Sequence, residues 1–270
     1  MGPDEDTSRS AESRHATIAS FDKGLRILEH IVHAEAPVRQ YEIASRFDMD
    51  KSSVLRFLNT LSQLGLVERD PTHKTYRPGA TLSIWASHLR ASNLLVTRAR
   101  PFLRSLALKT GQTAHLAVLR DDGVVLLEVM PSGHAVSVRQ TPGDWEPLYC
   151  SSVGKAILAL LPPAEQQLAI SRIKFRELTP NTLSAPYMLR AELQSVLTER
   201  VAFDDAENNP EVSCIGAPVV DRYGYPVASL GISFLNSQYP KGPRVLRGFI
   251  DEVKASAEAL GAALMQATLD

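Results

Sequence analysis

Residues Gln40–Asn59 read QYEIASRFDMDKSSVLRFLN, and the N-terminal part of the chain is organised around this stretch. Ile43, Ala44 and Phe47 follow helical spacing, so the first half is predicted to be a short helix with one apolar face. Asp48–Asp50 interrupts that pattern, and the last carboxylate of this segment is placed to cap a second helix. The sequence therefore predicts two helices joined by a tight corner.

The second of these helices has an apolar face and a polar face. The apolar stripe, expected to be buried, consists of Val54, Leu55, Leu58 and Leu61. The opposite face carries hydroxyl, amide and cationic side chains, namely Lys51, Ser52, Ser53, Arg56, Asn59 and Thr60. Cations bind phosphates, and guanidinium or amide groups bond base edges, so this face offers what a recognition helix needs in a major groove. An ordinary amphipathic helix pair in a core is the alternative for this stretch alone.

The residues that follow favour a winged helix-turn-helix. Leu64–Arg69 pass through a glycine into a strand, Asp70–His73 form a turn, and Lys74–Arg77 return as a second strand before Pro78-Gly79. This hairpin, the wing, is expected to bring cations to phosphates beside the groove. The residues expected to contact DNA are Arg39, Gln40, Tyr41, Lys51, Ser52, Ser53, Arg56, Asn59, Lys74 and Arg77.

A supporting helix is predicted over Phe21–Ala34, with Ser20 as its N-cap. Its buried stripe is expected to be Phe21, Leu25, Leu28 and Val32. Beyond the hairpin, Ala80–Leu95 reads as a linker helix and Thr97–Thr110 as another helix that stops at a glycine.

From Thr113 onward the apolar period becomes two, which indicates strands. Strands are predicted at Ala114–Leu119, Val124–Met130, Ala135–Gln140, Val201–Phe203, Val212–Val220 and Pro226–Phe234. Helices are predicted at Ala156–Leu161, Ala164–Ile170, Ala185–Thr198 and Arg244–Ala267. Strands mixed with helices in this order predict an α+β domain with a mixed, mainly antiparallel sheet.

Length and composition set further bounds. The chain has 270 residues, which is enough for two modest domains with a core each. Lys and Arg number 29 against 30 Asp and Glu, so any positive charge for DNA must be local. Two cysteines suit a reducing cytoplasm, and no apolar run approaches the roughly 20 residues of a membrane span. The polar, acidic segment 1–17 reads as a disordered tail rather than a signal peptide.

Four segments together resemble the IclR family of bacterial transcriptional regulators. They are the helix-turn-helix, SFDKGLRILEHI at Ser20–Ile31, LYCSSVGKAIL at Leu148–Leu158 and FDDAENNPEVSCIGAPV at Phe203–Val219. The resemblance covers about Ile18 to Leu264. It implies a winged helix-turn-helix over 18–79, a linker helix over 80–95 and an effector-binding domain over 96–270, related to GAF and profilin-like folds.

The same resemblance implies the partners. They are a palindromic operator in double-stranded DNA, a small organic acid as effector, and further copies of the chain in a homodimer or dimer-of-dimers tetramer. No cofactor and no membrane are expected, and the protein is not expected to be an enzyme.

The effector site is expected around Ser151–Lys155, just before an apolar helix. Backbone amides at a helix start attract a carboxylate, and Gly154 lets the backbone come close, although a plain N-cap by Ser151 or Ser152 is the alternative. The resemblance implies that the amides of Ser152 and Val153 hold the acid together with the side chains of Asp204, Cys214 and Ser233. Gly231 stands where glyoxylate-type pockets have a serine, so a larger aromatic or sugar-derived acid is expected.

Two other functions are open to the sequence. A catalytic cluster of Cys214, Asp204, Ser152 and Lys155 lacks a base, because no histidine follows His134 and Lys155 is expected to be solvated. An architectural DNA-binding protein without an effector would leave the large second domain unexplained. The histidines and cysteines do not have zinc-binding spacing.

Overall fold

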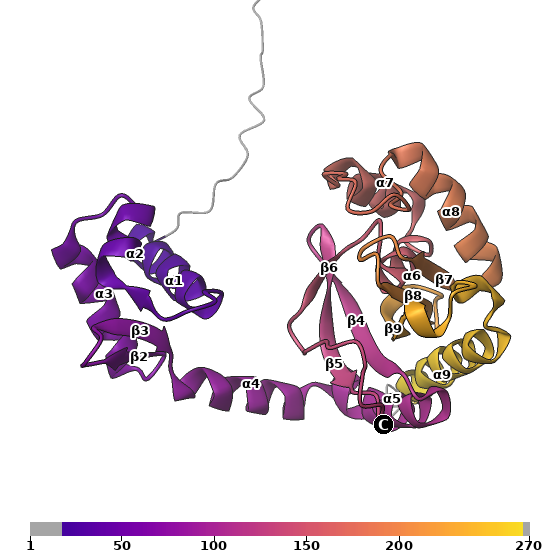
Figure 1. The fold of residues 1–270 in the computed structure, drawn as a ribbon, viewed down its shortest axis with the longest axis horizontal. Coiled ribbons are helices and arrows are strands. Elements are labelled where there is room, and N and C mark those ends of the chain that lie inside the picture. The colour runs from indigo at the N-terminus through magenta and orange to yellow at the C-terminus, as the bar shows by residue number, and fades with distance from the viewer. Residues whose placement is uncertain (1–17, 267–270) are drawn as a thin grey trace, which may run out of the picture. The chain divides into compact units, whose positions relative to one another are not determined.

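The computed structural model of the protein describes residues 18–266 (Figure 1). The tail predicted for residues 1–17 lies outside the described residues. The chain separates into two compact units that divide between Arg90 and Ala91. The first unit has one hydrophobic core, and the second has a core on each face of its sheet.

The first unit is the predicted winged helix-turn-helix. It consists of α1 (Ala19–Val32), β1 (Val38–Arg39), α2 (Gln40–Arg46), α3 (Lys51–Gln63), β2 (Val67–Asp70) and β3 (Thr75–Pro78). The wing strands β2 and β3 pair antiparallel, and β1, which the sequence did not predict, pairs with the other side of β3. The corner between α2 and α3 closes where the amide of Met49 donates to the carbonyl of Ala44 at 3.0 Å.

The buried face of α3 is narrower than predicted. Val54, Leu58 and Leu61 are buried in the core, at the spacing of one helix face. Leu55 was predicted to share this stripe but is 38% exposed. One residue along a helix is a rotation of about 100°, which carries the Leu55 side chain towards the polar face.

The buried face of α1 is shifted from the predicted stripe. Ile27 and Ile31 are fully buried and Leu28 packs against the core, whereas Phe21, Leu25 and Val32 are exposed. The apolar residues fill a broad arc on one side of this helix, so their spacing alone does not decide which part of that arc packs on the core. Packing against the other helices selects the two isoleucines.

Two predicted helix ends also differ. α1 begins at Ala19, without the side-chain cap expected from Ser20. The helix predicted over Ala80–Leu95 ends at Ser92 as α4 (Ala80–Ser92), because Asn93 starts a new helix, α5 (Leu94–Thr110). The side-chain oxygen of Asn93 accepts a hydrogen bond from the amide of Val96 at 3.2 Å, as an N-cap does.

The second unit is an α+β domain built on one sheet. Its further elements are β4 (Thr113–Arg120), β5 (Gly123–Met130), β6 (Trp145–Pro147), α6 (Ser152–Leu158), α7 (Pro163–Arg172), α8 (Pro186–Glu199), β7 (Ala202–Asp205), β8 (Val212–Val220), β9 (Pro226–Leu235), η1 (Asn236–Gln238), η2 (Pro243–Val245) and α9 (Arg247–Gln266). The strand order is β6-β5-β4-β9-β8-β7, and all of these pairings are antiparallel.

Helices cover both faces of this sheet. α5 and α9 pack on the face that carries Leu116, Ile215 and Leu230. α6 and α8 cover the opposite face, to which Ala117 and Ala202 contribute (Figure 1). Side chains alternate between the faces along each strand, so residues two apart on β4, β7, β8 and β9 share the α6 side.

The strand predicted over Ala135–Gln140 is absent. This segment has no regular structure, and the edge strand is β6, which pairs with the start of β5 instead. Alternation of apolar and polar residues indicates a strand only when a neighbouring strand is free to pair with it. Here Trp145 of β6 lies over Gly123 of β5, at a place where a Cβ atom would overlap the indole.

Candidate functional site

The N-terminus of α3 is held by the predicted cap. The carboxylate of Asp50 accepts hydrogen bonds from the Ser53 amide at 2.8 Å and from the Ser52 hydroxyl. These bonds hold the pKa of Asp50 well below its ordinary value. Ser52 is therefore partly committed to the cap, whereas the exposed side chains of Lys51 and Arg56 face solvent.

A second contact fixes α2 against α3. The side-chain amide of Gln40 donates to the carbonyl of Lys51 at 2.6 Å, which joins the starts of the two helices. The amide of Arg39 donates to Glu42 at 2.7 Å and closes the first turn of α2. Gln40, predicted as a DNA contact, thus also holds the two helices in register.

The wing is stiffened by its own acids. Asp70 accepts the amides of Thr72 and His73 and contacts the His73 ring at 2.9 Å, which lowers the pKa of Asp70 to about 2. Arg77 forms an ion pair with Glu68 at 2.9 Å across the two strands. Lys74 is exposed in the turn with a positive φ of 53°. Of the two predicted wing cations, Arg77 is therefore partly neutralised.

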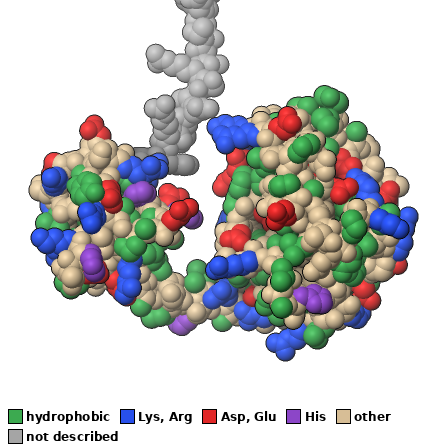
Figure 2. All heavy atoms as spheres, in the orientation of Figure 1, with side chains coloured by type: hydrophobic (Ala, Val, Ile, Leu, Met, Phe, Trp, Pro, Cys, Tyr) green, Lys and Arg blue, Asp and Glu red, His purple; other side chains and the backbone are tan. Residues whose placement is uncertain are grey.

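A surface hollow of about 430 Å³ lies beside α3. Ser53 and Arg56 line it from α3, and Lys23 lines it from α1. The sequence interpretation missed Lys23, because nothing in its spacing relates the first turns of α1 to α3. On the visible face of this unit, Lys and Arg side chains are interspersed with acidic ones rather than forming a continuous basic surface (Figure 2).

In the second unit, the predicted effector residues meet on the α6 side of the sheet. The pairing register places Asp204, Cys214 and Ser233 in one row across β7, β8 and β9. The Cys214 sulfur lies 3.1 Å from the Ser233 hydroxyl. The neighbouring row, two residues along each strand, contains Gly216 of β8 and Gly231 of β9.

The first turn of α6 lies directly on these glycines. A Cβ atom at Gly216 would come within 2.9 Å of the backbone of Ser152 and Val153. The side chain of Ser151 is the N-cap of α6, accepting the Gly154 amide at 3.2 Å and donating to the Pro147 carbonyl at 2.7 Å. For Ser151, the plain capping role is therefore confirmed.

The space expected beside Gly231 is already filled. A Cβ atom at Gly231 would meet the Nε2 atom of His115 and the Cγ1 atom of Val153, each at 3.0 Å. The lost serine hydroxyl is thus replaced by an imidazole from β4, which pairs with β9 at this position. The prediction that Gly231 leaves extra space for a larger ligand is therefore wrong at this position.

Burial makes the acids of this cluster hard to ionise. Asp204 accepts the amide of Glu207 at 2.7 Å, yet burial and the nearby charge of Glu207 raise the pKa of Asp204 to about 8. Burial also raises the pKa of Glu146 to about 7. Asp204 is therefore protonated at neutral pH, which removes the repulsion expected between its carboxylate and an acidic ligand.

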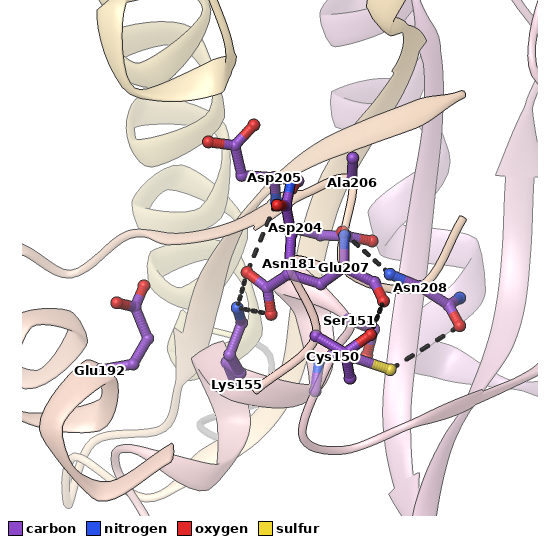
Figure 3. A network of polar contacts seen from close by, with 12 residues as sticks. Cys150, Ser151, Lys155, Asn181, Glu192, Asp204, Asp205, Ala206, Glu207 and Asn208 are labelled. Carbon is purple, nitrogen blue, oxygen red and sulfur yellow. Dashed lines mark hydrogen bonds and ion pairs between the residues drawn. The ribbon is translucent and has the colours of Figure 1, made fainter. Parts of the chain in front are cut away.

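A buried ion pair connects α6 to the loop after β7. The ammonium of Lys155 contacts both carboxylate oxygens of Glu207, at 2.5 and 2.6 Å (Figure 3). Lys155 is fully buried, so the expectation that it is solvated is wrong. The hydroxyl groups of Thr179 and Thr182 donate to the backbone carbonyl of Glu207 and so hold the same loop in place.

Sequence reasoning missed His115, Gln140, Glu146 and the Lys155–Glu207 pair. His115 left one usable signal, since it is a polar residue within the mainly apolar run Ala114–Leu119 of β4. Both cysteine thiols are buried, and burial raises their pKa values, so neither is an activated nucleophile. Within residues 18–266, no three His, Cys, Asp or Glu side chains are grouped to hold a metal ion. No helix in that range is long and apolar enough to cross a bilayer.

Comparison with known families matches both units. The family "Bacterial transcriptional regulator IclR C-terminal" matches residues 88–262, and the "IclR helix-turn-helix domain" matches residues 20–71. The HTH-type transcriptional regulator BhcR of Paracoccus denitrificans is 32% identical over 216 residues, which cover 80% of this chain and 77% of that protein.

Solved structures share the fold. The IclR protein of Thermotoga maritima superposes with a TM-score of 0.73 at 28% identity and covers 91% of this chain and 98% of its own. An IclR homolog of Microbacterium hydrocarbonoxydans, complexed with 4-hydroxybenzoate, has a TM-score of 0.78 at 20% identity. That alignment covers 91% of this chain and 99% of the Microbacterium chain.

Proposed function

The chain belongs to the IclR family of bacterial transcriptional regulators, and we propose which part of the regulatory function each of its two units carries out. The protein is a DNA-binding transcriptional regulator and not an enzyme. We assign α3 to the major groove of a palindromic operator and the α6 side of the second unit to a small organic acid. In this proposal the acid changes operator affinity, and the protein acts in the cytoplasm.

The polar face of α3 supports the DNA assignment. Arg56 is exposed, its guanidinium can bond a guanine edge in two places, and it forms no ion pair within residues 18–266. Lys51 and Asn59 share the exposed side of the same helix. We assign Lys74, which is exposed in the wing turn, to a phosphate contact.

Replacing Arg56 by Ala is expected to weaken operator binding about fivefold to 150-fold, or about 1–3 kcal/mol, and to relax specificity at one base pair. Lys74→Ala is the matched control, because loss of a phosphate contact weakens all sequences alike and reduces the salt slope by about one. Titration of operator and mutated-operator duplexes by fluorescence anisotropy at several salt concentrations distinguishes the loss of a base contact from the loss of a phosphate contact. Unchanged operator affinity in Arg56→Ala would refute the groove assignment.

The observation that carries the effector assignment is a cluster of buried polar atoms without partners. Within residues 18–266 these include the Ser152 hydroxyl and both ring nitrogens of His115, which lie beside the predicted row of Asp204, Cys214 and Ser233. Unpaired buried polar groups are costly, and a bound ligand would satisfy them. Neutral Asp204 and the backbone of Ser152 and Val153 support an acid as that ligand. The Microbacterium homolog bound to 4-hydroxybenzoate makes aromatic acids reasonable first probes.

A panel of organic acids tests this assignment. Thermal denaturation should find at least one acid that stabilises the protein, by about 2.7 kcal/mol at 100 times its dissociation constant. The same acid, at saturation, should change operator affinity about fivefold or more, because typical coupling free energies are 1–3 kcal/mol. A stabilising acid with no effect on operator affinity would contradict the coupling, whereas no stabilising acid would favour an architectural DNA-binding protein.

The linker helix supports self-association. None of the residues of α4 is buried, and Ile84 and Trp85 are 55% and 54% exposed. Exposed large apolar side chains close together mark an interaction surface, and a second copy would place a second α3 on a palindrome. We therefore assign α4 to a homodimer interface; a dimer-of-dimers tetramer would need a further surface.

Replacing Trp85 by Asp is expected to weaken dimerisation about 30-fold or more, because a buried interface tryptophan typically contributes 2 kcal/mol or more. Sedimentation velocity across a concentration series measures the change. Ser83→Asp is the control, since it introduces the same charge about 200° around the helix from Trp85. Equal dimer affinity in both variants would exclude this face of α4 from the interface.

A further inference from the structure

The floor of the proposed effector site contains an unusual pair of residues at one position of the sheet. Gly231 of β9 pairs in register with Gly216 of β8 on one side and with His115 of β4 on the other. The two glycines present no side chains, and the first turn of α6 packs directly on their backbone. His115 occupies the end of this row, and its Nε2 atom and the Cγ1 atom of Val153 each lie 3.0 Å from the point where a Gly231 Cβ would stand.

The ring of His115 is buried, and neither of its nitrogens has a hydrogen-bond partner within residues 18–266. Burial lowers the pKa of His115 to about 4, so the imidazole is neutral at physiological pH and offers one N–H donor and one acceptor nitrogen. The side chain of Gln140 lies close enough to oppose that shift but does not form a well-aligned hydrogen bond with the ring.

Gln140 supplies a second acceptor. Its amide nitrogen donates to Glu146 at 2.9 Å, which turns its Oε1 atom to a buried place where it has no donor. The amide oxygen of Gln140 can only accept a hydrogen bond, whereas the neutral imidazole of His115 offers one N–H donor and one acceptor nitrogen. A keto oxygen or a carboxylate can accept from the imidazole but cannot donate to Gln140, whereas a hydroxyl group can do both.

We propose that His115 and Gln140 recognise a hydroxyl group of the effector, so that the effector is a hydroxy acid rather than a keto acid or an unsubstituted acid. This rests on the proposed effector site and narrows its ligand class. His115 lies beside Gly231 and forms a hydrogen bond with the hydroxyl group.

Matched pairs of acids that differ in one hydroxyl test the proposal on the full chain. Suitable pairs are lactate with propionate, 3-hydroxybutyrate with butyrate, and 4-hydroxybenzoate with benzoate, each titrated by calorimetry. At least one hydroxylated member should bind tenfold or more tightly than its partner, because a site built for a hydroxyl leaves its own polar groups unpaired without it.

His115→Phe should abolish this preference within the pair, because it removes the ring nitrogens that contact the hydroxyl. A merely structural role of His115 would weaken both members alike. Ser213→Ala is the matched control, because Ser213 also has a buried, unpartnered hydroxyl but lies on β8 facing the opposite side of the sheet. It should keep the preference.

The outcomes separate this inference from the effector site itself. Acids that bind without any preference for the hydroxyl, or a preference that survives in His115→Phe, would overturn the inference and leave the effector site standing. Binding of no acid to the unmodified protein would overturn the effector site and the inference with it. If His115→Phe does not fold, the pairs measured on the unmodified protein and on Ser213→Ala still decide the hydroxyl requirement.

Discussion

Lys155→Met is expected to lower the free energy of unfolding by about 3–5 kcal/mol, because it leaves the buried carboxylate of Glu207 without its partner. The ion pair joins α6 to the loop that follows β7, so both the α6 start and Asp204 lose their support (Figure 3). Urea denaturation followed by circular dichroism measures the change.

Lys109→Met is the control for that prediction. Lys109 forms an ion pair with Glu252 at 2.8 Å that is exposed to solvent, and exposed pairs contribute less than about 1 kcal/mol. The double variant Lys155→Met with Glu207→Leu should recover most of the lost stability, since it removes the uncompensated charge. Equal effects of Lys155→Met and Lys109→Met would mean that the Lys155–Glu207 contact is not a buried ion pair in solution.

The loss of stability in Lys155→Met is also expected to depend on pH. Burial raises the pKa of Glu207, and the ammonium of Lys155 opposes that shift, so its removal raises the pKa further. A carboxyl whose pKa is raised on folding contributes stability below its ordinary pKa, and this stability is lost as pH rises. Lys155→Met should therefore be less destabilised at pH 5 than at pH 8.

Affinity for a monocarboxylate effector is expected to fall by about tenfold per pH unit above about pH 8. The physical reason is ionisation of Asp204, whose carboxyl is neutral below its raised pKa and repels a bound carboxylate above it. The charged or titratable groups around it are Glu207, Lys155, Cys150, Cys214 and Glu146. Calorimetric titration with the stabilising acid between pH 7 and 10 measures the slope.

Asp204→Asn keeps an oxygen to accept the Glu207 amide but cannot ionise, so its affinity should stay level over the same range. The same substitution has a ligand-independent consequence. Because the pKa of Asp204 is raised on folding, the unmodified protein should lose stability as pH rises from about 4 to 8, and Asp204→Asn should lose less. A parallel slope in both proteins, for affinity and for stability, would show that Asp204 is not the titrating group.

The sequence by itself determined most of the helices and strands of this protein and the class to which it belongs. Asp50 capped α3 as predicted, and the helix, helix and hairpin of the first unit follow from local spacing and turn residues. The family resemblance also brought Asp204, Cys214 and Ser233 to one site, and the register confirms that they are neighbours. These features are local, or are carried by motifs that the sequence spells out.

The tertiary structure alone decided which faces pack and which distant residues meet. On α1, the apolar residues fill a broad arc of the helix, and only packing selects Ile27 and Ile31 over Phe21 and Leu25. His115 and Gly231 are 116 residues apart in the chain, and the antiparallel register of β4 with β9 places them side by side. Hydrophobic periodicity indicates which helices and strands form locally. Strand register and helix packing depend instead on contacts between segments that are far apart in the sequence.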